Sequence, residues 1–418
     1  MPGLKILYIN TGSGHKSQAS AIAEAAHKKG LDAEIVNFSD IAAPGNQGKY
    51  EEAYGHWLKS PHKTISGLNL GVQHLKYYLI DSKRDKVDKF IKANKDNTII
   101  LAHPHLQHPF AHVEKKLFVL HTDPVNWPMN TDVSAKGERV HLGTKDVLEE
   151  IKPRAGQEIK GIPVSPDVYR RAPTPFGKKE FSVVVAAGGD GPEIANMTKQ
   201  VLQAKLPENT VIHAVTGRNE KDFEELTELA KSHPNLKPYK FAPLKPMFQN
   251  SDLNVIRTHG TTFAETVVAG KPTVYYGPKG HPLDFQAKLT KDTAEYGHRH
   301  IGNPLAVGLD EIPKAITTAI RRYPSLAESS RKAKKDYGNP ASDIVGVVTK
   351  AACWGAFDDE LKKIADTISA SETTNEIERI RPDDDTEDKK RFINRSPRVN
   401  YYNETATGAG LAPAGYVS

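Results

Sequence analysis

Residues 4–15, LKILYINTGSGH, join an apolar strand pattern to a glycine loop, and an alanine-rich stretch with helical spacing follows over residues 19–26. A buried strand, a glycine turn and a helix N-terminus form a loop that suits a phosphate or nucleotide, because free backbone N–H groups and the helix dipole meet there. The loop is not a P-loop, which requires Gly-Lys-Ser/Thr. It does not complete G-x-G-x-x-G either, since Ser17 replaces the third glycine. The alternative is that Gly12 and Gly14 only let the helix pack close to the strand.

The same order of strand, turn and helix recurs along the chain. Helical patterns cover residues 146–152, 192–204, 220–232, 263–269 and 309–322. Strand-like apolar runs separate them at residues 33–37, 98–102, 117–121, 140–142, 182–187, 210–215, 252–256 and 272–276. Strands that alternate with helices predict parallel sheets built from βαβ units. The order restarts at Phe181 with a strand, the turn Gly188-Gly189-Asp190-Gly191 and a helix, which predicts two Rossmann-like α/β domains facing each other across a cleft.

Proline content and polarity divide the chain further. A proline-rich stretch with little periodicity predicts a linker over residues 166–178, between a first domain at 1–165 and a second at 179–340. Residues 341–369 have helical patterns, and residues 370–418 are polar enough to predict a disordered tail.

Composition excludes several classes of protein. The 418 residues have a formal net charge of +6, and this mild excess does not indicate a nucleic-acid partner. No apolar run reaches the length of a membrane span, and the N-terminus lacks a signal-peptide pattern, so we expect a cytoplasmic protein. The single cysteine, Cys353, excludes a disulfide framework and a cysteine-based zinc site.

A second loop lies in residues 251–277, SDLNVIRTHGTTFAETVVAGKPTVYYG. We expect a strand ending near Ile256, a turn at Gly260, Thr261 and Thr262 as caps of the next helix, and Glu265 in its first turn. Hydroxyls and free N–H groups at a helix N-terminus suit a diphosphate, and a carboxylate one turn later suits the two hydroxyls of a ribose. The alternative is an ordinary N-cap with a capping-box-like glutamate.

This second loop resembles the nucleotide-binding half of GT-B glycosyltransferases. The branch is that of monogalactosyldiacylglycerol synthases, processive diacylglycerol glucosyltransferases and the lipid II-forming GlcNAc transferase. Its pattern K-P/S-G-G-L-T-x-S-E-A, then G-x-P, stands here as RTHGTTFAETVVAGKP, with Arg257, Gly260, Thr262, Glu265, Gly270 and Pro272 in register.

The first half resembles the same branch. GSGHKSQASAIAEA, which begins at Gly12, resembles the pattern G-x-G-H-x-x-A-A-x-A-L-x-E-A, and LAHPHLQHPF resembles its T-H-P-F region. His121-Thr122-Asp123 with Trp127 resembles T-D-F-x-x-H-x-x-W, and residues 161–164 match G-I-P-V. The similarity spans residues 4–290. The donor-sugar loop departs from the pattern, because His281 and Pro282 replace its Gly-Gln pair and His259 replaces a glycine of the phosphate loop.

The resemblance implies an inverting transfer of a hexose from a UDP-sugar to a hydroxyl acceptor, typically a glycerolipid or another lipid. It implies no tightly bound cofactor and no metal, with the UDP-sugar as donor substrate. The residues that it assigns to the UDP-sugar are Gly12, Gly14, Gly188, Gly189, Gly191, Phe241, Met247, Arg257, His259, Gly260, Thr261, Thr262, Glu265, Asp284 and Gln286.

For the chemistry, His15 is the expected general base, because an imidazole with a pKa near 6.5 accepts a proton at neutral pH. Asp123 is expected to orient His15 or the acceptor, or else to be a structural cap. Two other interpretations of the function stay open. One is a UDP-sugar 2-epimerase, for which no second set of carboxylate bases is evident, and the other is a nucleotide-binding protein without catalytic activity.

Two further stretches support weaker hypotheses. His103, His105, His108 and His112 lie close together, but no carboxylate stands at a matching spacing, so we expect no metal site. Apolar and basic residues alternate over residues 43–80, which would suit an anionic membrane surface, although a buried helix pair explains them equally well. The apolar members are Trp57, Leu58, Leu68, Leu70, Leu75, Tyr77 and Tyr78.

Overall fold

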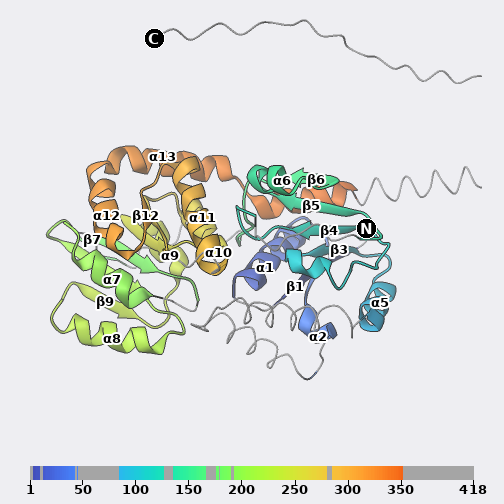
Figure 1. Cartoon of the computed structure of the whole chain (residues 1–418), viewed down its shortest axis with the longest axis horizontal. Helices are drawn as coiled ribbons and strands as arrows, with labels where there is room; N and C mark the ends of the chain where they lie inside the picture. Colours follow the sequence, from blue (N-terminus) through green and yellow to red (C-terminus); the bar gives the residue numbers. More distant parts are fainter. Residues whose placement is uncertain are drawn as a thin grey trace, which may run out of the picture. The chain divides into compact units, whose positions relative to one another are not determined.

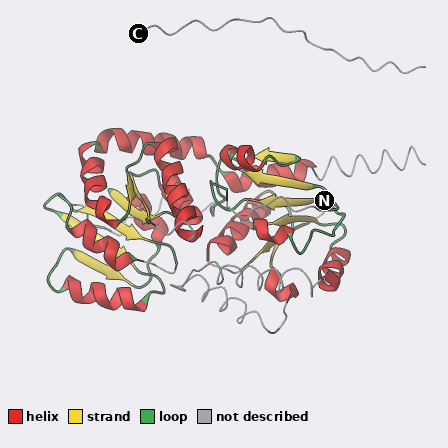
Figure 2. Cartoon of the chain, in the orientation of Figure 1, coloured by secondary structure: helices red, strands yellow, loops and turns green. Residues whose placement is uncertain are grey.

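The structure is a computed structural model, and it describes residues 3–9, 13–42, 45, 84–126, 135–165, 176–177, 179–189, 193–279 and 285–351. Two parallel six-stranded sheets lie within these ranges (Figure 1). The first is formed by residues 4–158 and the second by residues 181–307, and these segments are called the N-terminal and C-terminal halves below. Helices follow most of the strands in both halves, as the alternating sequence pattern predicts (Figure 2).

The N-terminal sheet has the order β2-β1-β3-β4-β5-β6 with all neighbours parallel. Because β2 and β3 lie on opposite sides of β1, the chain reverses its direction across the sheet between β1 and β3. In open α/β sheets, ligands bind beyond the carboxyl ends of the strands at such a switch point. The strands are β1 (Leu4–Tyr8), β2 (Ala33–Asn37), β3 (Thr98–Leu101), β4 (Leu117–Leu120), β5 (Arg139–Gly143) and β6 (Ala155–Glu158). The helices are α1 (Ser13–Lys28), α2 (Phe38–Ala42), α5 (Arg84–Ala93), η2 (Pro104–Gln107) and α6 (Lys145–Ile151).

The C-terminal sheet has the order β12-β11-β10-β7-β8-β9, again with parallel neighbours. Its switch point lies between β7 and β10. The strands are β7 (Phe181–Ala186), β8 (Thr210–Val215), β9 (Leu236–Tyr239), β10 (Leu253–Arg257), β11 (Thr273–Gly277) and β12 (Leu305–Val307). The helices are α7 (Ile194–Leu202), α8 (Glu220–Ala230), α9 (Leu244–Asn250), α10 (Gly260–Ala269), α11 (Phe285–Ile301), η4 (Leu309–Glu311), α12 (Ile312–Arg321) and α13 (Tyr323–Tyr337).

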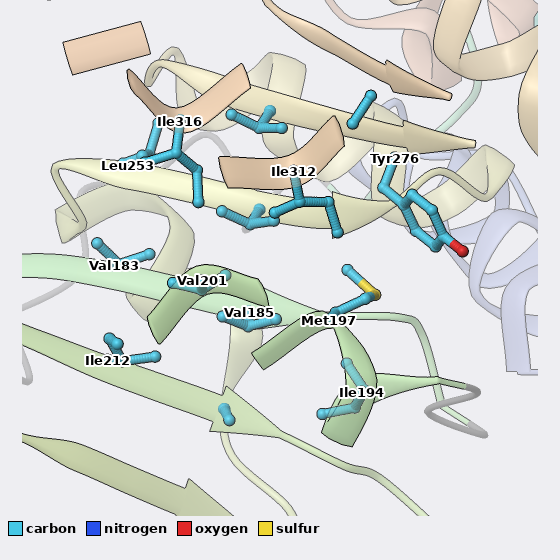
Figure 3. Packing of buried hydrophobic residues seen from close by; sticks show 14 of the residues in the cluster. Val183, Val185, Ile194, Met197, Val201, Ile212, Leu253, Tyr276, Ile312 and Ile316 are labelled. Atoms are coloured by element: carbon cyan, nitrogen blue, oxygen red, sulfur yellow. The ribbon is translucent and has the colours of Figure 1, made fainter. Parts of the chain in front are cut away.

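Strand β7 shows how the sheet is buried on both faces. Val183 and Val185 belong to the core formed with α7 and α12 (Figure 3), whereas Val184 and Ala186 belong to the core formed with α9 and α10. Side chains alternate between the two faces of a strand, so an unbroken apolar run results where helices cover both faces.

The chain returns to the N-terminal half after α13. A helical segment at residues 340–351 contributes Ala341, Ile344, Val345 and Val348 to the core that contains α1 and β1. The remainder of the predicted helical region to residue 369 and the predicted tail at 370–418 lie outside the described residues. Among the helices that the structure describes, none is long and apolar enough to cross a membrane.

Tyr337, at the end of α13, holds the segment that follows β6. Its hydroxyl accepts the N–H of Ile162 at 2.7 Å and donates to the carbonyl of the same residue at 3.0 Å. Tyr337→Phe would leave both backbone groups buried without this partner, so we expect the free energy of unfolding to fall by about 2 kcal/mol. Denaturant unfolding measures the loss, and Tyr323→Phe serves as the control, because the Tyr323 hydroxyl makes one long contact with Asp252, at 3.5 Å. Equal losses in the two variants would contradict the role given to Tyr337.

Candidate functional site

Two histidines meet at the switch point of the N-terminal sheet. His15 lies in the first turn of α1, directly after the loop that leaves β1, and His103 follows β3. Their ring centroids are 4.4 Å apart in an edge-to-face arrangement. The contact arises because β1 and β3 are parallel neighbours, which brings their carboxyl ends together although they are about ninety residues apart in the chain.

The environment of His15 differs from the expectation. Burial lowers the pKa of His15 from 6.5 to about 4, so the assumption of an unperturbed imidazole is wrong for the ligand-free protein. The ring is therefore neutral at pH 7 and keeps one nitrogen as an acceptor. Its Nδ1 atom is buried, and it has no hydrogen-bond partner among the described residues.

A glycine turn follows β7 at the switch point of the C-terminal sheet. Gly188 has a φ of +74°, which only glycine adopts readily. A Cβ atom on Gly188 would lie 3.7 Å from Thr262 Oγ1 and 3.8 Å from His259 Cδ2. The turn therefore lies against the N-terminus of α10, and Gly189 continues it by accepting a hydrogen bond from the Arg218 N–H at 3.0 Å.

The N-terminus of α10 differs in detail from the prediction. The helix begins at Gly260, and its N-cap residue is His259, whose side chain makes no capping hydrogen bond. Thr261 and Thr262 lie inside the first turn, so the expectation that they cap the helix is wrong, and Glu265 lies in the second turn rather than the first. Within this first turn the Gly260 N–H donates to Asp123 and the Phe263 N–H donates to the His259 carbonyl at 2.7 Å. Among the described residues no partner is recorded for the N–H groups of Thr261 and Thr262.

A cation stands beside this helix end. The Arg257 Nη1 atom lies 3.3 Å from Glu193 Oε2, and the Tyr276 hydroxyl donates to the same oxygen at 3.4 Å. Glu193 adopts a left-handed φ of +63° immediately before α7. Burial, and then the charge of Arg257, lower the pKa of His259 to about 3, so that His259 is neutral.

The two halves touch at their helix N-termini. The Gln18 side chain of α1 donates to Thr261 Oγ1 of α10 at 3.2 Å. A Cβ atom on Gly14 would lie only 2.9 Å from the same hydroxyl oxygen, so glycine allows this close approach. The element that carries His15 therefore lies against the element that carries Thr261, Thr262 and Glu265.

Asp123 of the N-terminal half also lies at the start of α10. A Cβ atom on Gly260 would stand 2.5 Å from Asp123 Oδ1. Burial raises the pKa of Asp123 to about 6, and hydrogen bonds from the Thr122 hydroxyl and the Gly260 N–H partly offset that rise. The carboxyl group thus occupies an anion position at the helix N-terminus. Its expected pairing with His15 is not among these contacts and stays a prediction.

Glu265 carries a second perturbed carboxyl group on α10. Burial raises its pKa from 4.5 to about 7. No hydrogen bond or ion pair of this side chain is recorded within the described part of the chain to offset the burial. A carboxyl group in such surroundings gains stability from any ligand that donates hydrogen bonds to it.

The remaining predicted residues lie apart from these contacts or outside the described ranges. Phe241 is 67% exposed, and Met247 is buried in the same core cluster as Phe248. His112 pairs with Asp88 at 2.9 Å. In the ranges that the structure describes, no group of three potential metal ligands occurs. Nothing is described of residues 46–83, Gly12, Trp127, Gly191, His281, Pro282, Asp284 or the side chain of Gln286.

Four residues of this region were not predicted to contribute to the site. His103 was considered only as a metal ligand, and Gln18, Glu193 and Tyr276 were not considered. One signal was present, since Gln18 stands where the pattern of the resembled branch has alanine. The other three come to the site through strand pairing or through a backbone conformation that the sequence does not encode locally.

Solved structures with the same architecture support the fold class. The glycotransferase of kitacinnamycin has a TM-score of 0.59 and 12% identity, covering 84% of this chain and 99% of that one. MurG of Acinetobacter baumannii has a TM-score of 0.56 and 13% identity, covering 84% and 100%. The UDP-GlcNAc 2-epimerase of Neisseria meningitidis, solved with UDP-GlcNAc bound, has a TM-score of 0.53 and 12% identity, covering 84% and 100%.

These likenesses define the fold. The chain has the two Rossmann-like domains of the GT-B architecture, as the sequence predicts. No protein-family model matches the sequence, and no curated protein matches it either.

Proposed function

We propose that the protein is an inverting glycosyltransferase that moves a hexose from a UDP-sugar to a hydroxyl acceptor. The observation that carries this proposal is the contact between the first turns of α1 and α10, made by Gly14, Gln18 and Thr261. It supports the proposal because His15 directly follows Gly14 in α1, and the diphosphate would bind at the first turn of α10. Both helix ends lie at switch points of parallel sheets, where α/β proteins bind their ligands.

On the donor side, the diphosphate would bind at the N-terminus of α10. The backbone N–H groups and hydroxyls of Thr261 and Thr262, together with the cation of Arg257, would stabilise the negative charge that develops on departing UDP. Gly188 lies opposite that turn, where a Cβ atom would be in van der Waals contact with Thr262 and His259. Glu265, one helical turn further, would accept hydrogen bonds from the ribose hydroxyls.

On the acceptor side, the neutral His15 ring would take the proton of the acceptor hydroxyl. A pKa of about 4 makes His15 a weak base in the ligand-free protein. A bound diphosphate would bring negative charge close to the ring and raise this pKa, because an anion nearby favours the imidazolium form. The bound donor would therefore make His15 a stronger base, and the acceptor oxygen that loses its proton to His15 would attack the sugar carbon as UDP leaves.

The acceptor is proposed to be a lipid on an anionic membrane surface. This step rests on the resemblance to lipid glycosyltransferases and on the mixture of apolar and basic residues over 43–80, which lie outside the described residues except for Gly45. Sedimentation with phosphatidylglycerol vesicles, compared with phosphatidylcholine vesicles, tests it directly.

An epimerase is the second candidate, and one observation favours it. Asp123 and Glu265 both have raised pKa values near α10, and carboxyl groups of that kind exchange protons with a substrate near neutral pH. Incubation with UDP-GlcNAc in the absence of any acceptor separates the readings. An epimerase converts the sugar under these conditions, whereas a transferase leaves its configuration unchanged.

The donor half is tested by thermal stability in UDP, GDP, ADP and TDP at matched concentrations. A ligand at a hundred times its Kd stabilises the native state by about 2.7 kcal/mol. We expect a shift of several degrees with UDP and smaller shifts with the other nucleotides. No shift with any nucleotide would show that the altered loops at His259 and His281 have abolished the donor site.

A further inference from the structure

Gln18 is a buried polar residue on an otherwise apolar helix face. Its side chain is 2% exposed, and its neighbours Ala19, Ala21 and Ile22 belong to the hydrophobic core. A buried carboxamide destabilises a protein unless hydrogen bonds replace its contacts with water. The partners of Gln18 therefore indicate why glutamine replaces the alanine of the resembled pattern.

The carboxamide joins three segments of the chain. Its Nε2 atom donates to the Thr122 carbonyl at 3.0 Å and to the Thr261 hydroxyl oxygen at 3.2 Å. Thr122 precedes Asp123 in the loop after β4, whereas Thr261 is the second residue of α10. One side chain of α1 thus bonds both to its own half and to the C-terminal half.

These two partners of the Gln18 amide make the Thr261 hydroxyl an acceptor toward α1. A carbonyl only accepts, so the amide nitrogen of Gln18 faces Thr122, and the same nitrogen donates to Thr261. The Thr261 oxygen then uses a lone pair for Gln18, and its own proton is left to donate elsewhere. Across the described residues the structure records no acceptor for that proton. The buried Gln18 Oε1 atom has no hydrogen-bond partner there either.

Gly14 keeps this contact short. With 2.9 Å between a hypothetical Cβ and the Thr261 hydroxyl oxygen, a side chain at position 14 would displace either that hydroxyl or α1. His15 follows directly in the chain, so the same contact fixes the distance between the proposed base and the proposed diphosphate site.

We propose that Gln18 is a positioning residue of the donor site. Its amide directs the Thr261 hydroxyl to donate to a phosphate oxygen at the N-terminus of α10, and it holds the first turn of α1 against that site. This inference rests on the proposed function, because it assigns the diphosphate of the donor as the acceptor of the Thr261 proton. The resembled pattern has alanine at this position, so the hydrogen bonds of the Gln18 amide are a feature of this chain and not of the pattern.

The test is a double-mutant cycle read by calorimetric titration with UDP. Gln18→Met keeps the volume of the side chain and removes its hydrogen bonds, and Thr261→Val removes the hydroxyl. A hydrogen bond to a charged group typically accounts for about tenfold in affinity or more. We expect each variant to bind UDP about tenfold more weakly, and the double variant to bind no more weakly than either, since both remove one chain of hydrogen bonds. Thr261→Ser should retain the affinity of the wild type.

The control is Thr266→Val on the same helix. The Thr266 hydroxyl donates to the Phe263 carbonyl at 2.8 Å within α10, so its removal changes the helix without changing the α1 contact. We expect its UDP affinity to equal that of the wild type. If the methionine is not accommodated, as shown by a lost thermal transition, Gln18→Ala takes its place.

Different results would overturn the proposed function and the role proposed for Gln18. If the wild-type protein binds no UDP, both the proposed function and the role proposed for Gln18 are overturned. If the wild-type protein binds UDP but the effects of the two substitutions are additive, only the role proposed for Gln18 is overturned. The same holds if Gln18→Met binds UDP as tightly as the wild type.

Discussion

Replacing His15 by alanine is expected to lower kcat for sugar transfer by about 10²–10⁴-fold, the usual contribution of a positioned general base. The Kd for UDP should stay nearly unchanged, because the proposed contacts of the diphosphate come from α10 and Arg257. The measurements are initial rates with a saturating UDP-hexose and calorimetric titration with UDP. Transfer at the wild-type rate would exclude His15 as the base.

The pH dependence of stability gives the same variant a second readout. The pKa of His15 is about 4 in the folded protein and 6.5 when unfolded, so the unfolded state takes up the proton first. Above pH 6.5 His15 is neutral in both states and does not reduce the free energy of unfolding. As the pH falls toward 4, the unfolded state gains a proton that the folded state does not, so the free energy of unfolding decreases. His15→Ala should therefore lose less stability between these pH values than the wild type. His300→Ala is a suitable control, because His300 is 45% exposed and pairs with Asp146 at the surface.

The central strands of both sheets were predictable from the sequence. The runs at residues 98–102, 182–187 and 210–215 match β3, β7 and β8 to within a residue at each end. Strands buried on both faces give continuous apolar runs, and this signal is local. The glycine turns and the restart at Phe181 predicted the two Rossmann-like halves, whereas the strand orders with their switch points were not predicted.

Three edge strands gave no such signal. Strand β6 is mostly exposed and polar, β12 has three residues, and β9 contains Pro238, which is tolerated at an edge because one side of an edge strand needs no ladder hydrogen bonds. Their pairing depends on a neighbouring strand that is already in place. A pattern read from one segment alone could not reveal them.

The pKa values and the long-range contacts of the candidate site residues were not predictable from the sequence. His15 and Glu265 were predicted from the sequence, yet burial lowers the pKa of His15 to about 4 and raises the pKa of Glu265 to about 7. Burial depends on the packing of distant segments. The contact between Gln18 and Thr261 joins residues 243 positions apart. Such contacts follow from the tertiary arrangement and leave no periodicity in the chain.

Replacing Glu265 by glutamine is expected to stabilise the protein at alkaline pH. The folded pKa of about 7 exceeds the value of 4.5 for an unperturbed glutamate, so the folded state holds its proton while the unfolded state has already lost it. Between pH 4.5 and 7 the stability of the wild type therefore falls as the pH rises, and above pH 7 the full cost remains. With an allowance for residual exposure, that cost is about 2 kcal/mol. Denaturant unfolding at pH 8 should show Glu265→Gln more stable by this amount, and unfolding at pH 4.5 should show no difference.

The same substitution should weaken donor binding, and the combination identifies a ligand-binding carboxylate. A carboxylate accepts from both ribose hydroxyls, whereas the amide of glutamine offers one accepting oxygen, so we expect the affinity for UDP-glucose to fall about tenfold at pH 8. UDP-glucose is the better probe than UDP, because its diphosphate diester does not titrate near neutral pH. Glu228→Gln is the control: its side chain is 73% exposed, so neither stability nor affinity should change. A residue kept only for packing would gain stability and lose no affinity, and that outcome would remove Glu265 from the proposed ribose site. A gain in stability together with a loss of affinity in Glu265→Gln means that the carboxylate of Glu265 destabilises the folded protein but binds the ribose hydroxyls.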